Sequence, residues 1–169
     1  MIDDDRARTL DLVGRRLVLR RATLAEIIGR RHAELRPGLP RASAEFAGDD
    51  EPATWHFGAF VAEHAGAGGG ALACATFMAR PHDGEDAYQL RGMATRADLA
   101  RQGIGGALLR HALAVLVARG GARLFWCNAR LAAVPFYARL GWTVVSGEFE
   151  VPSIGPHHVM TFRAVPGEQ

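Results

Sequence analysis

The sequence predicts an α/β (α+β) fold in which helices cover the faces of one mixed sheet. Short runs with the apolar patterns of strands alternate with runs of helical periodicity, in the order β-α-β-β-β-α-β-α-β-β. Hydrophobic residues make up 49% of the 169 residues, enough for one sizeable core without disulfides or metals. No linker or repeat divides the chain. We therefore expect one domain over residues 1–169, with residues 1–14 as a loosely ordered leading segment.

Seven strands and three helices are predicted. The strands come from short apolar runs bounded by turn residues, and they span residues 15–22, 55–63, 71–80, 87–95, 122–128, 142–150 and 157–163. The helices come from apolar residues at helical spacing, and they span residues 24–34, 105–119 and 132–140.

Local signals support several boundaries. Thr23 and Glu26 have the spacing of a capping box at the start of the first helix. Residues 65–70, rich in glycine, supply the turn between the second and third strands. Gly92 interrupts the fourth strand and is a candidate bulge site. Residues 35–54 contain three prolines and are predicted to form a long loop, which in a compact domain is usually functional or mobile.

Composition and charge argue against several function classes. A net charge of +2 is too small to indicate nucleic-acid binding by itself. All 20 basic side chains are arginine, which either genomic base composition or a need for forked phosphate donors explains. No apolar run could span a bilayer, no signal peptide opens the chain, and Cys74 and Cys127 lack metal-ligand spacing. We expect a cytoplasmic protein with reduced thiols, no metal, and no nucleic-acid or membrane partner.

The most informative stretch is residues 100–109 (ARQGIGGALL), which joins a strand to a helix. Gly103, Gly105 and Gly106 let a ligand approach the backbone closely. The N–H groups of the first helical turn, together with the helix dipole, favour a phosphate or pyrophosphate. The alternative is a glycine-rich turn that binds nothing.

Two known phosphate loops fit this stretch poorly. A P-loop needs Lys followed by Ser or Thr, where Ala107 and Leu108 stand instead. A dinucleotide-binding fingerprint needs an acidic residue about 20 positions further on, yet no Asp or Glu occurs from Leu99 to Gly147. Six arginines in that stretch, with no carboxylate, give a local charge of +6. This charge suits a polyanionic cofactor such as coenzyme A, and a solvated basic face is the alternative.

These residues resemble the GNAT superfamily of N-acetyltransferases. Gly103-Ile104-Gly105 matches the glycine half of the superfamily's pyrophosphate motif, although Ala100 departs from its first position. Residues 134–142 (VPFYARLGW) resemble its second motif, in the expected order and separation. Further segments are similar to a largely uncharacterised bacterial branch related to the ElaA-type proteins; they are residues 31–38 (RHAELRPG), 89–93 (QLRGM) and 155–160 (GPHHVM).

The resemblance implies a GNAT-like, mostly antiparallel sheet in which the fourth and fifth predicted strands splay apart. It implies acetyl-CoA as the co-substrate, with the pantetheine arm between these strands. The cofactor-binding residues that it implies are Met93, Ala94, Thr95, Arg101, Gln102, Gly103, Ile104, Gly105, Gly106, Asn128 and Phe136.

The resemblance also implies direct transfer of an acetyl group to the amine of a small molecule or peptide. Tyr137 matches the family's tyrosine and is predicted to protonate the departing thiolate; an aromatic core residue is the alternative. His157 is a candidate base because histidine titrates in the useful range. A structural or substrate-orienting role for His157 stays open, as do Glu34, Glu148, Glu150 and a water chain in the role of base.

Four other questions stay open at this point. Cys127 could form an acyl-enzyme, although a small buried residue is the preferred interpretation. Glu45, Asp49, Asp50 and Glu51 in the long loop mildly favour a cationic acceptor, with a solvated acidic loop as the preferred alternative. The competing function is a catalytically idle acyl-CoA-binding or regulatory domain, and a homodimer is an open option.

Overall fold

The computed structural model describes residues 7–64 and 70–166, and in this part nine strands form one sheet. The strands are β1 (Arg8–Leu12), β2 (Arg15–Ala22), β3 (Trp55–Val61), β4 (Ala73–Ala79), β5 (Tyr88–Thr95), β6 (Leu124–Arg130), β7 (Thr143–Val144), β8 (Phe149–Val151) and β9 (Gly155–Arg163). The α-helices are α1 (Leu24–Leu35), α2 (Ile104–Gly120) and α3 (Val134–Arg139). Short 3-10 turns are η2 (Arg41–Ala44), η3 (Ala62–His64), η4 (Ala97–Leu99) and η5 (Leu131–Ala133).

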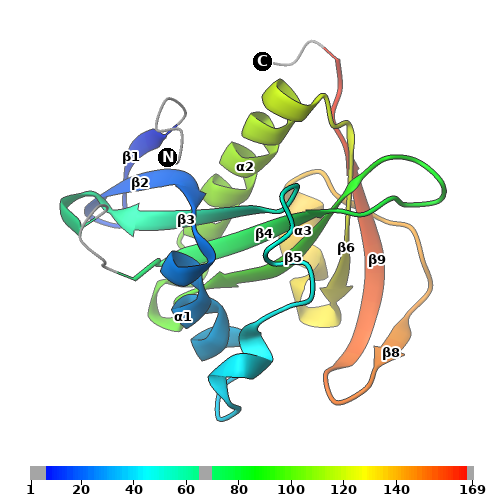
Figure 1. Ribbon diagram of the computed structural model, residues 1–169, viewed down its shortest axis with the longest axis horizontal. Coiled ribbons are helices and arrows are strands. Elements are labelled where there is room, and N and C mark those ends of the chain that lie inside the picture. Colours follow the sequence, from blue (N-terminus) through cyan, green and yellow to red (C-terminus); the bar gives the residue numbers. More distant parts are fainter. Residues whose placement is uncertain (1–6, 65–69, 167–169) are drawn as a thin grey trace.

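The sheet is mixed and mostly antiparallel, as the sequence predicts. Its strand order is β1-β2-β3-β4-β5-β6-β9-β7, and β8 pairs with β9. Only β5 and β6 run parallel, because α2 connects them as a crossover. Figure 1 shows β5 and β6 diverging in the middle of the sheet.

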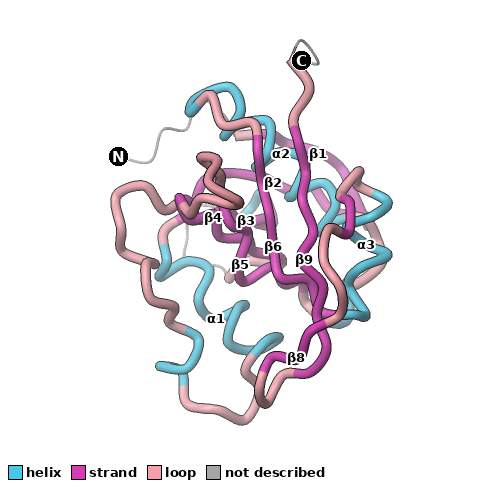
Figure 2. The backbone as a smooth tube through the Cα atoms, turned by 90° about the vertical axis from the view of Figure 1, so that its right-hand side faces the viewer, coloured by secondary structure: helices cyan, strands magenta, loops and turns pink. Residues whose placement is uncertain are grey.

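Helices cover both faces of the sheet. Figure 2 shows α1 on one side of the strands and α3 on the other. The larger core lies under α2, where Leu108 and Leu116 pack against Phe57 and Phe125. A smaller core lies under α1 around Ile27. The capping box predicted at the start of α1 is present, since Thr23 and Glu26 exchange hydrogen bonds.

Gly92 forms the predicted bulge in β5. Cys74 pairs with Ala94 and Thr76 pairs with Arg91, so β5 has one more residue than β4 over this interval. Gly92 has φ +63°, a conformation that side-chain-bearing residues rarely adopt. The extra residue reverses the alternation of side chains along β5, so that residues two positions apart on either side of Gly92 face opposite sides of the sheet. Arg91 therefore stacks on Phe46 of the long loop under α1.

Beyond the bulge, β5 turns its odd-numbered residues toward α2. The Met93 methyl lies 3.4 Å from where a Cβ on Gly105 would stand, and the Thr95 hydroxyl lies 3.0 Å from it. Arg91 and Met93, two positions apart in one strand, thus face opposite sides of the sheet.

The strands β5 and β6 part soon after they meet. Their pairing is limited to Tyr88 with Phe125 and Gln89 with Trp126, although β5 continues to Thr95. The predicted splaying of these two strands is confirmed.

The termini of the sheet differ from the prediction. Residues 8–12, expected within a loosely ordered segment, form β1 because Leu10 and Leu12 pack against the main core. Val13 and Gly14 close the hairpin with positive φ values of 52° and 70°, as a type I′ turn requires. Residues 1–6 of that segment lie outside the described part, as do residues 65–69 of the predicted glycine turn.

The predicted strand over residues 142–150 is interrupted. It appears as the two short strands β7 and β8, which pair with different parts of β9. Between them, the Ser146 hydroxyl accepts a hydrogen bond from the Val159 N–H at 2.8 Å. A side chain thereby takes the place of a backbone partner where the two segments separate.

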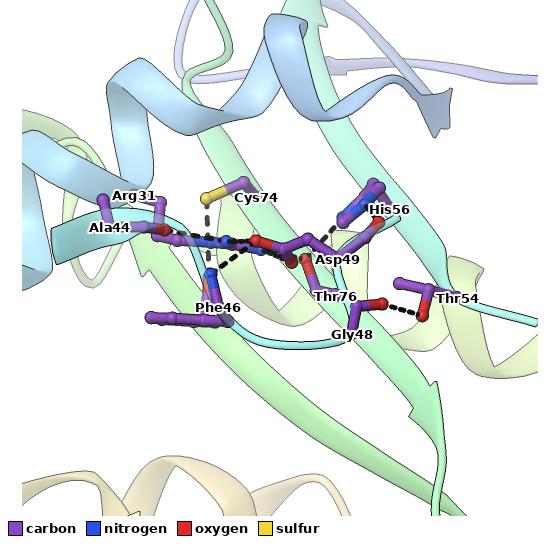
Figure 3. Close-up of polar contacts among 10 residues, drawn as sticks. Arg31, Ala44, Phe46, Gly48, Asp49, Thr54, His56, Cys74 and Thr76 are labelled. Carbon is purple, nitrogen blue, oxygen red and sulfur yellow. Dashed lines mark hydrogen bonds and ion pairs between the residues drawn. The ribbon is translucent and has the colours of Figure 1, made fainter. Parts of the chain in front are cut away.

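The long loop, residues 36–54, is held by a buried ion pair (Figure 3). Arg31 of α1 is fully buried and donates to both carboxylate oxygens of Asp49, at 2.7 and 3.0 Å. It also donates to the Ala44 carbonyl at 2.9 Å and the Thr76 hydroxyl at 2.7 Å. Asp49 in turn accepts the Phe46 N–H at 2.7 Å. Three segments of the chain, namely α1, the long loop and β4, therefore meet at one guanidinium group.

We expect Asp49→Ala to lower the free energy of unfolding by about 3–5 kcal/mol, because it leaves Arg31 charged, buried and unpaired. Glu51→Ala is the matched control. It removes the other bidentate carboxylate of the loop, whose partner Arg80 lies near the surface. Urea unfolding of both variants checks this prediction. Equal midpoints for the two would show that the buried pair does not hold the loop.

Candidate functional site

The parting of β5 and β6 leaves a cleft of about 220 Å³. Its walls come from five places in the fold: the end of α1 with the long loop, β5, β6, α3, and the β8–β9 region. Tyr137 and His157, the two predicted catalytic residues, both line it, as does Cys127. The structure therefore brings together residues that are far apart in the sequence.

The strand β6 presents different residues to its two faces. Cys127 and Ala129 belong to the main core, whereas Asn128 and Arg130 are exposed. Arg130 pairs in register with His157 on the neighbouring strand β9. Directly opposed residues of antiparallel strands share a face, so Arg130 and His157 lie on the same side of the gap.

Tyr137 is a buried residue of α3 that reaches the cleft. Its ring packs between Phe136, with centroids 5.1 Å apart, and Trp142, at 5.4 Å. Pro135 stands in the first turn of this short helix, where its missing N–H costs nothing. Burial raises the pKa of the Tyr137 phenol, and the neighbouring Cys127 adds to the effect. The phenol is therefore protonated at neutral pH.

His157 is held in one tautomer. Its Nδ1 lies 2.8 Å from the Gly155 carbonyl oxygen, and its ring stacks on Phe149 with centroids 6.0 Å apart. A carbonyl only accepts hydrogen bonds, so in the neutral ring Nδ1 carries the proton and Nε2 carries the lone pair. His157 is only 5% exposed and lines the cleft, which leaves Nε2 as its basic atom.

The other candidate bases lie elsewhere. Glu34 forms an ion pair with Arg30 at 3.0 Å and accepts the Ala97 N–H at 3.3 Å. Glu148 and Glu150 are exposed, and neither lines the cleft. Among the candidates named from the sequence, His157 alone is in place.

Cys127 is a core residue with an unreactive thiol. It is 2% exposed, and burial raises its pKa to about 12. The thiolate, which is the nucleophilic form, is therefore scarce at neutral pH.

On the face of the sheet opposite Arg130 and His157, the N-terminus of α2 lacks a side-chain cap. Its N-cap residue is Gly103, at φ +93°, and the first helical hydrogen bond runs from the Ala107 N–H to the Gly103 carbonyl. The N–H groups of the first turn point out of the helix end, where they favour an anion. Arg101, with φ +63°, is exposed just before this turn. Gln102 donates to the Asp98 carbonyl at 3.3 Å and braces the turn.

Several predicted cofactor residues meet beside this helix end. Gly105 lies against Thr95, Met93 and Phe136, with the Phe136 ring 3.7 Å from where a Cβ on Gly105 would stand. Two predicted residues can take part only through their backbone. The Ile104 side chain is buried in the main core, and Ala94 packs in the core under α1.

The six arginines of the acid-free stretch do not form a single basic surface. Arg101 and Arg110 flank the start of α2. Arg119 lies at the other end of this 17-residue helix, roughly 22 Å from its first residue at 1.5 Å per residue. Arg123 follows it. The predicted charge of +6 is therefore spread out, with Arg101 and Arg119 at opposite ends of α2 and Arg130 at the cleft.

The acidic residues of the long loop do not face the cleft either. Asp49 forms an ion pair with Arg31, and Glu51 forms one with Arg80. The mild indication of a cationic acceptor is thus not supported. The cleft instead contains Arg36, Arg91 and Phe46, none of which the sequence singled out individually. Arg36 and Arg91 lie within segments 31–38 and 89–93, whose resemblance to one bacterial branch was the available signal.

The described residues contain no group of three or more His, Cys, Asp or Glu side chains that could hold a metal ion. No helix among them has the length and apolarity needed to cross a membrane.

Comparison with known proteins identifies the family. The sequence profile described as "Acetyltransferase (GNAT) family" matches residues 26–142. The "Uncharacterized N-acetyltransferase YitI" of Bacillus subtilis (strain 168) is 35% identical over 133 residues, which are 77% of this chain and 85% of that protein.

Solved structures show the same fold. Escherichia coli ElaA matches with a TM-score of 0.67 and 15% identity, covering 96% of this chain and 100% of that one. An aminoglycoside 6'-N-acetyltransferase complexed with coenzyme A matches with a TM-score of 0.64 and 14% identity, covering 85% and 92%. The sequence matches confirm the resemblance in the motifs, and this chain belongs to the GNAT family of acetyltransferases.

Proposed function

We propose that the protein transfers an acetyl group from acetyl-CoA to the amine of a small molecule or peptide, by direct attack in a ternary complex. One observation carries the proposal. The gap between β5 and β6 lies between the uncapped end of α2 on one face and the Arg130–His157 side of the cleft on the other. Two substrates that enter from opposite faces would meet there, which supplies the orientation that a bimolecular transfer needs. A cytoplasmic location and a homodimer stay predictions.

The start of α2 fits the pyrophosphate of coenzyme A. Its uncapped N–H groups and helix dipole favour negative charge, and Gly103, Gly105 and Gly106 keep side chains out of the way. Arg101 would add a forked donor. We assign to the coenzyme these groups together with Gln102, the backbone of Ile104, the Met93, Ala94 and Thr95 segment, Asn128 and Phe136. The bound thioester supplies an acetyl group that is activated toward amines.

Tyr137 would donate a proton from its hydroxyl to the departing sulfur. Its raised pKa keeps the phenol protonated at neutral pH, as a donor must be. The same shift makes it a weak acid, so its main contribution would be a hydrogen bond to the developing thiolate. The position of Tyr137 beside the gap, on the α3 side of the cleft, supports this role.

His157 would take the proton that the attacking amine loses. Its Nδ1–H is committed to the Gly155 carbonyl, which fixes the ring and leaves Nε2 as the acceptor. Its place beside Arg130, on the face opposite α2, supports an acceptor approach from that side.

Direct attack is favoured over an acyl-enzyme. The only cysteine that lines the cleft is Cys127, whose thiol is neutral because burial raises its pKa to about 12. In the part of the chain that the structure describes, no carboxylate lines the cleft to activate it.

We expect Gly105→Val to raise the Kd for acetyl-CoA at least about tenfold, or about 1.4 kcal/mol. The new side chain would stand beside Thr95 and Met93, where the helix start is otherwise bare. Gly29→Val is the matched control, since it makes the same change in α1, where a Cβ would meet no atom within 4 Å. Calorimetry gives the affinity, and thermal melting verifies folding. Wild-type affinity in a folded Gly105→Val protein would refute this placement of the coenzyme.

We expect Tyr137→Phe to lower kcat about 10²–10⁴-fold with little change in packing, because only the hydroxyl is lost. Tyr88→Phe is the control, since Tyr88 stacks on Phe125 outside the cleft. Free-thiol release with an accepted amine is the measurement, under conditions where chemistry limits the rate. A Tyr137→Phe rate within about twofold of wild type would rule out the acid role. If no amine in a broad panel is turned over while acetyl-CoA binds, the alternative of an idle acyl-CoA-binding domain holds.

We expect Cys127→Ala to retain most activity, because the thiol takes no part in the transfer. Intact-protein mass after incubation with acetyl-CoA alone should show no acetyl adduct on the wild type. Cys74→Ala, which empties a similar volume in the other core, controls for loss of packing. A hydroxylamine-sensitive adduct that disappears in Cys127→Ala and is released by amine would establish the acyl-enzyme route instead.

A further inference from the structure

We propose that the acceptor is a small amino carboxylate, whose carboxylate group binds the arginines of the cleft: Arg91 first, with Arg36 and Arg130 beside it. This inference rests on the proposed function, since it places the acceptor amine in the cleft on the α1 side of the gap. It assigns a substrate class to a site whose family membership leaves the acceptor undefined.

The charges in the cleft wall have one sign. Arg36 comes from the end of α1, Arg91 from β5 and Arg130 from the end of β6, and no Asp or Glu among residues 7–64 and 70–166 lines the cleft. Arginines from three separate elements thus line a single concave site, and the guanidinium groups of Arg36 and Arg91 lie over the same ring, that of Phe46. A cleft of this kind attracts anions and disfavours cations.

These arginines have no carboxylate partner in the described part of the chain. Neighbouring arginines do: Arg31 is paired with Asp49, and Arg80 with Glu51. Arg36 donates only to the carbonyl of its own neighbour Leu35, at 3.0 Å. The arginines of the cleft thus keep their positive charge without a carboxylate partner, whereas the carboxylates Asp49 and Glu51 of the long loop are paired with arginines outside the cleft.

Of the three arginines, Arg91 is the best placed to bind a carboxylate. Its guanidinium lies 4.5 Å from the Phe46 ring centroid, and Arg36 lies 5.9 Å from the same ring. Burial lowers the pKa of Arg91, and Arg31, Arg36 and Arg80 add to this while Asp49 opposes it. An excess of positive charge around a half-buried guanidinium is relieved when an anion binds. The stacked, planar group offers a fork that matches a carboxylate.

This anion site is separate from the one proposed for the phosphates of coenzyme A. The bulge at Gly92 places Arg91 on the α1 face, whereas Met93 and Thr95 lie against Gly105 at the start of α2. An anion at Arg91 and an anion at α2 would therefore bind on opposite faces of β5. The acceptor's amine would lie between them, near His157.

The size and lining of the cleft narrow the acceptor further. At about 220 Å³ it is smaller than the roughly 300–1,000 Å³ of pockets for drug-sized ligands. Leu35, Phe46, Val151 and Ile154 supply apolar walls. An α-amino acid with an aliphatic or aromatic side chain satisfies the size, the charge and the apolar surface together.

The test compares acceptors that differ only in the carboxylate. Leucine, leucinamide and 3-methylbutylamine are offered with acetyl-CoA, and rates of thiol release are expressed per unprotonated amine. We expect leucine to have a kcat/KM at least about tenfold above the other two. Arg91→Gln should reduce this preference about 10–100-fold, mainly through a higher KM for leucine, since a hydrogen-bonded ion pair is lost.

A matched variant controls for the loss of one positive charge. Arg41 lies in η2 of the long loop, is exposed, and does not line the cleft. Arg41→Gln should therefore keep the wild-type preference for leucine. A second arm replaces acetyl-CoA by succinyl-CoA, because a carboxylate on the acyl group is the other chemical source of the same anion.

The outcomes separate this inference from the proposed function. Equal rates with leucine and 3-methylbutylamine would leave the transferase intact and overturn the carboxylate site. A preference for succinyl-CoA that Arg91→Gln removes, without any preference among acceptors, would also overturn it. If no amine is turned over, calorimetry with leucine and the coenzyme A complex decides. Binding that Arg91→Gln abolishes would support the site while refuting the transferase, and absence of binding would overturn the site.

Discussion

The buried ion pair between Arg31 and Asp49 is the contact on which one side of the cleft depends. Removing both charges from water is expensive, and the bidentate geometry together with the hydrogen bonds to Thr76 and the Ala44 carbonyl offsets that cost. The pair joins α1, the long loop and β4 at a single point. It also fixes Phe46, whose N–H donates to Asp49 and whose ring lies 4.1 Å from the Arg31 guanidinium. A loop with little regular structure thereby becomes a fixed wall.

That wall constrains the strand beneath it. A Cβ at position 92 would stand 2.8 Å from Arg31 Nε and 3.2 Å from the Phe46 ring, so the site needs glycine for space as well as for its positive φ. Glycine permits the bulge, and the bulge determines which side of the sheet the neighbouring side chains face. Arg91 faces the α1 side and Met93 the α2 side as a consequence. The ion pair, the bulge and the two-sided gap are therefore one connected arrangement.

The parts of this arrangement that could be predicted are those with local signals. The capping box of Thr23 and Glu26, the bulge at Gly92 and the turn before α2 each depend on a few neighbouring residues. The strand β1 was missed because five alternating residues near a terminus give a weak pattern, and its order comes from packing of Leu10 and Leu12. The pairing and the location of the charged side chains were the least predictable property. The acidic residues of the long loop are consumed by ion pairs with distant arginines, and the arginines of the cleft come from separate segments with no shared local pattern.

The positive charge of the cleft affects which group can accept the proton of the acceptor amine. A carboxylate would be the usual choice for removing a proton from an ammonium group, yet none of the described carboxylates lines the cleft. The arginines that line the cleft would disfavour another positive charge, and they would lower the pKa of an amine that enters among them. A carboxylate on the same acceptor would be held by those arginines while its amine is shifted toward the neutral, nucleophilic form. In the proposed reaction, His157, oriented by the Gly155 carbonyl, would then be the proton acceptor. The field that selects the acceptor would also prepare it for attack.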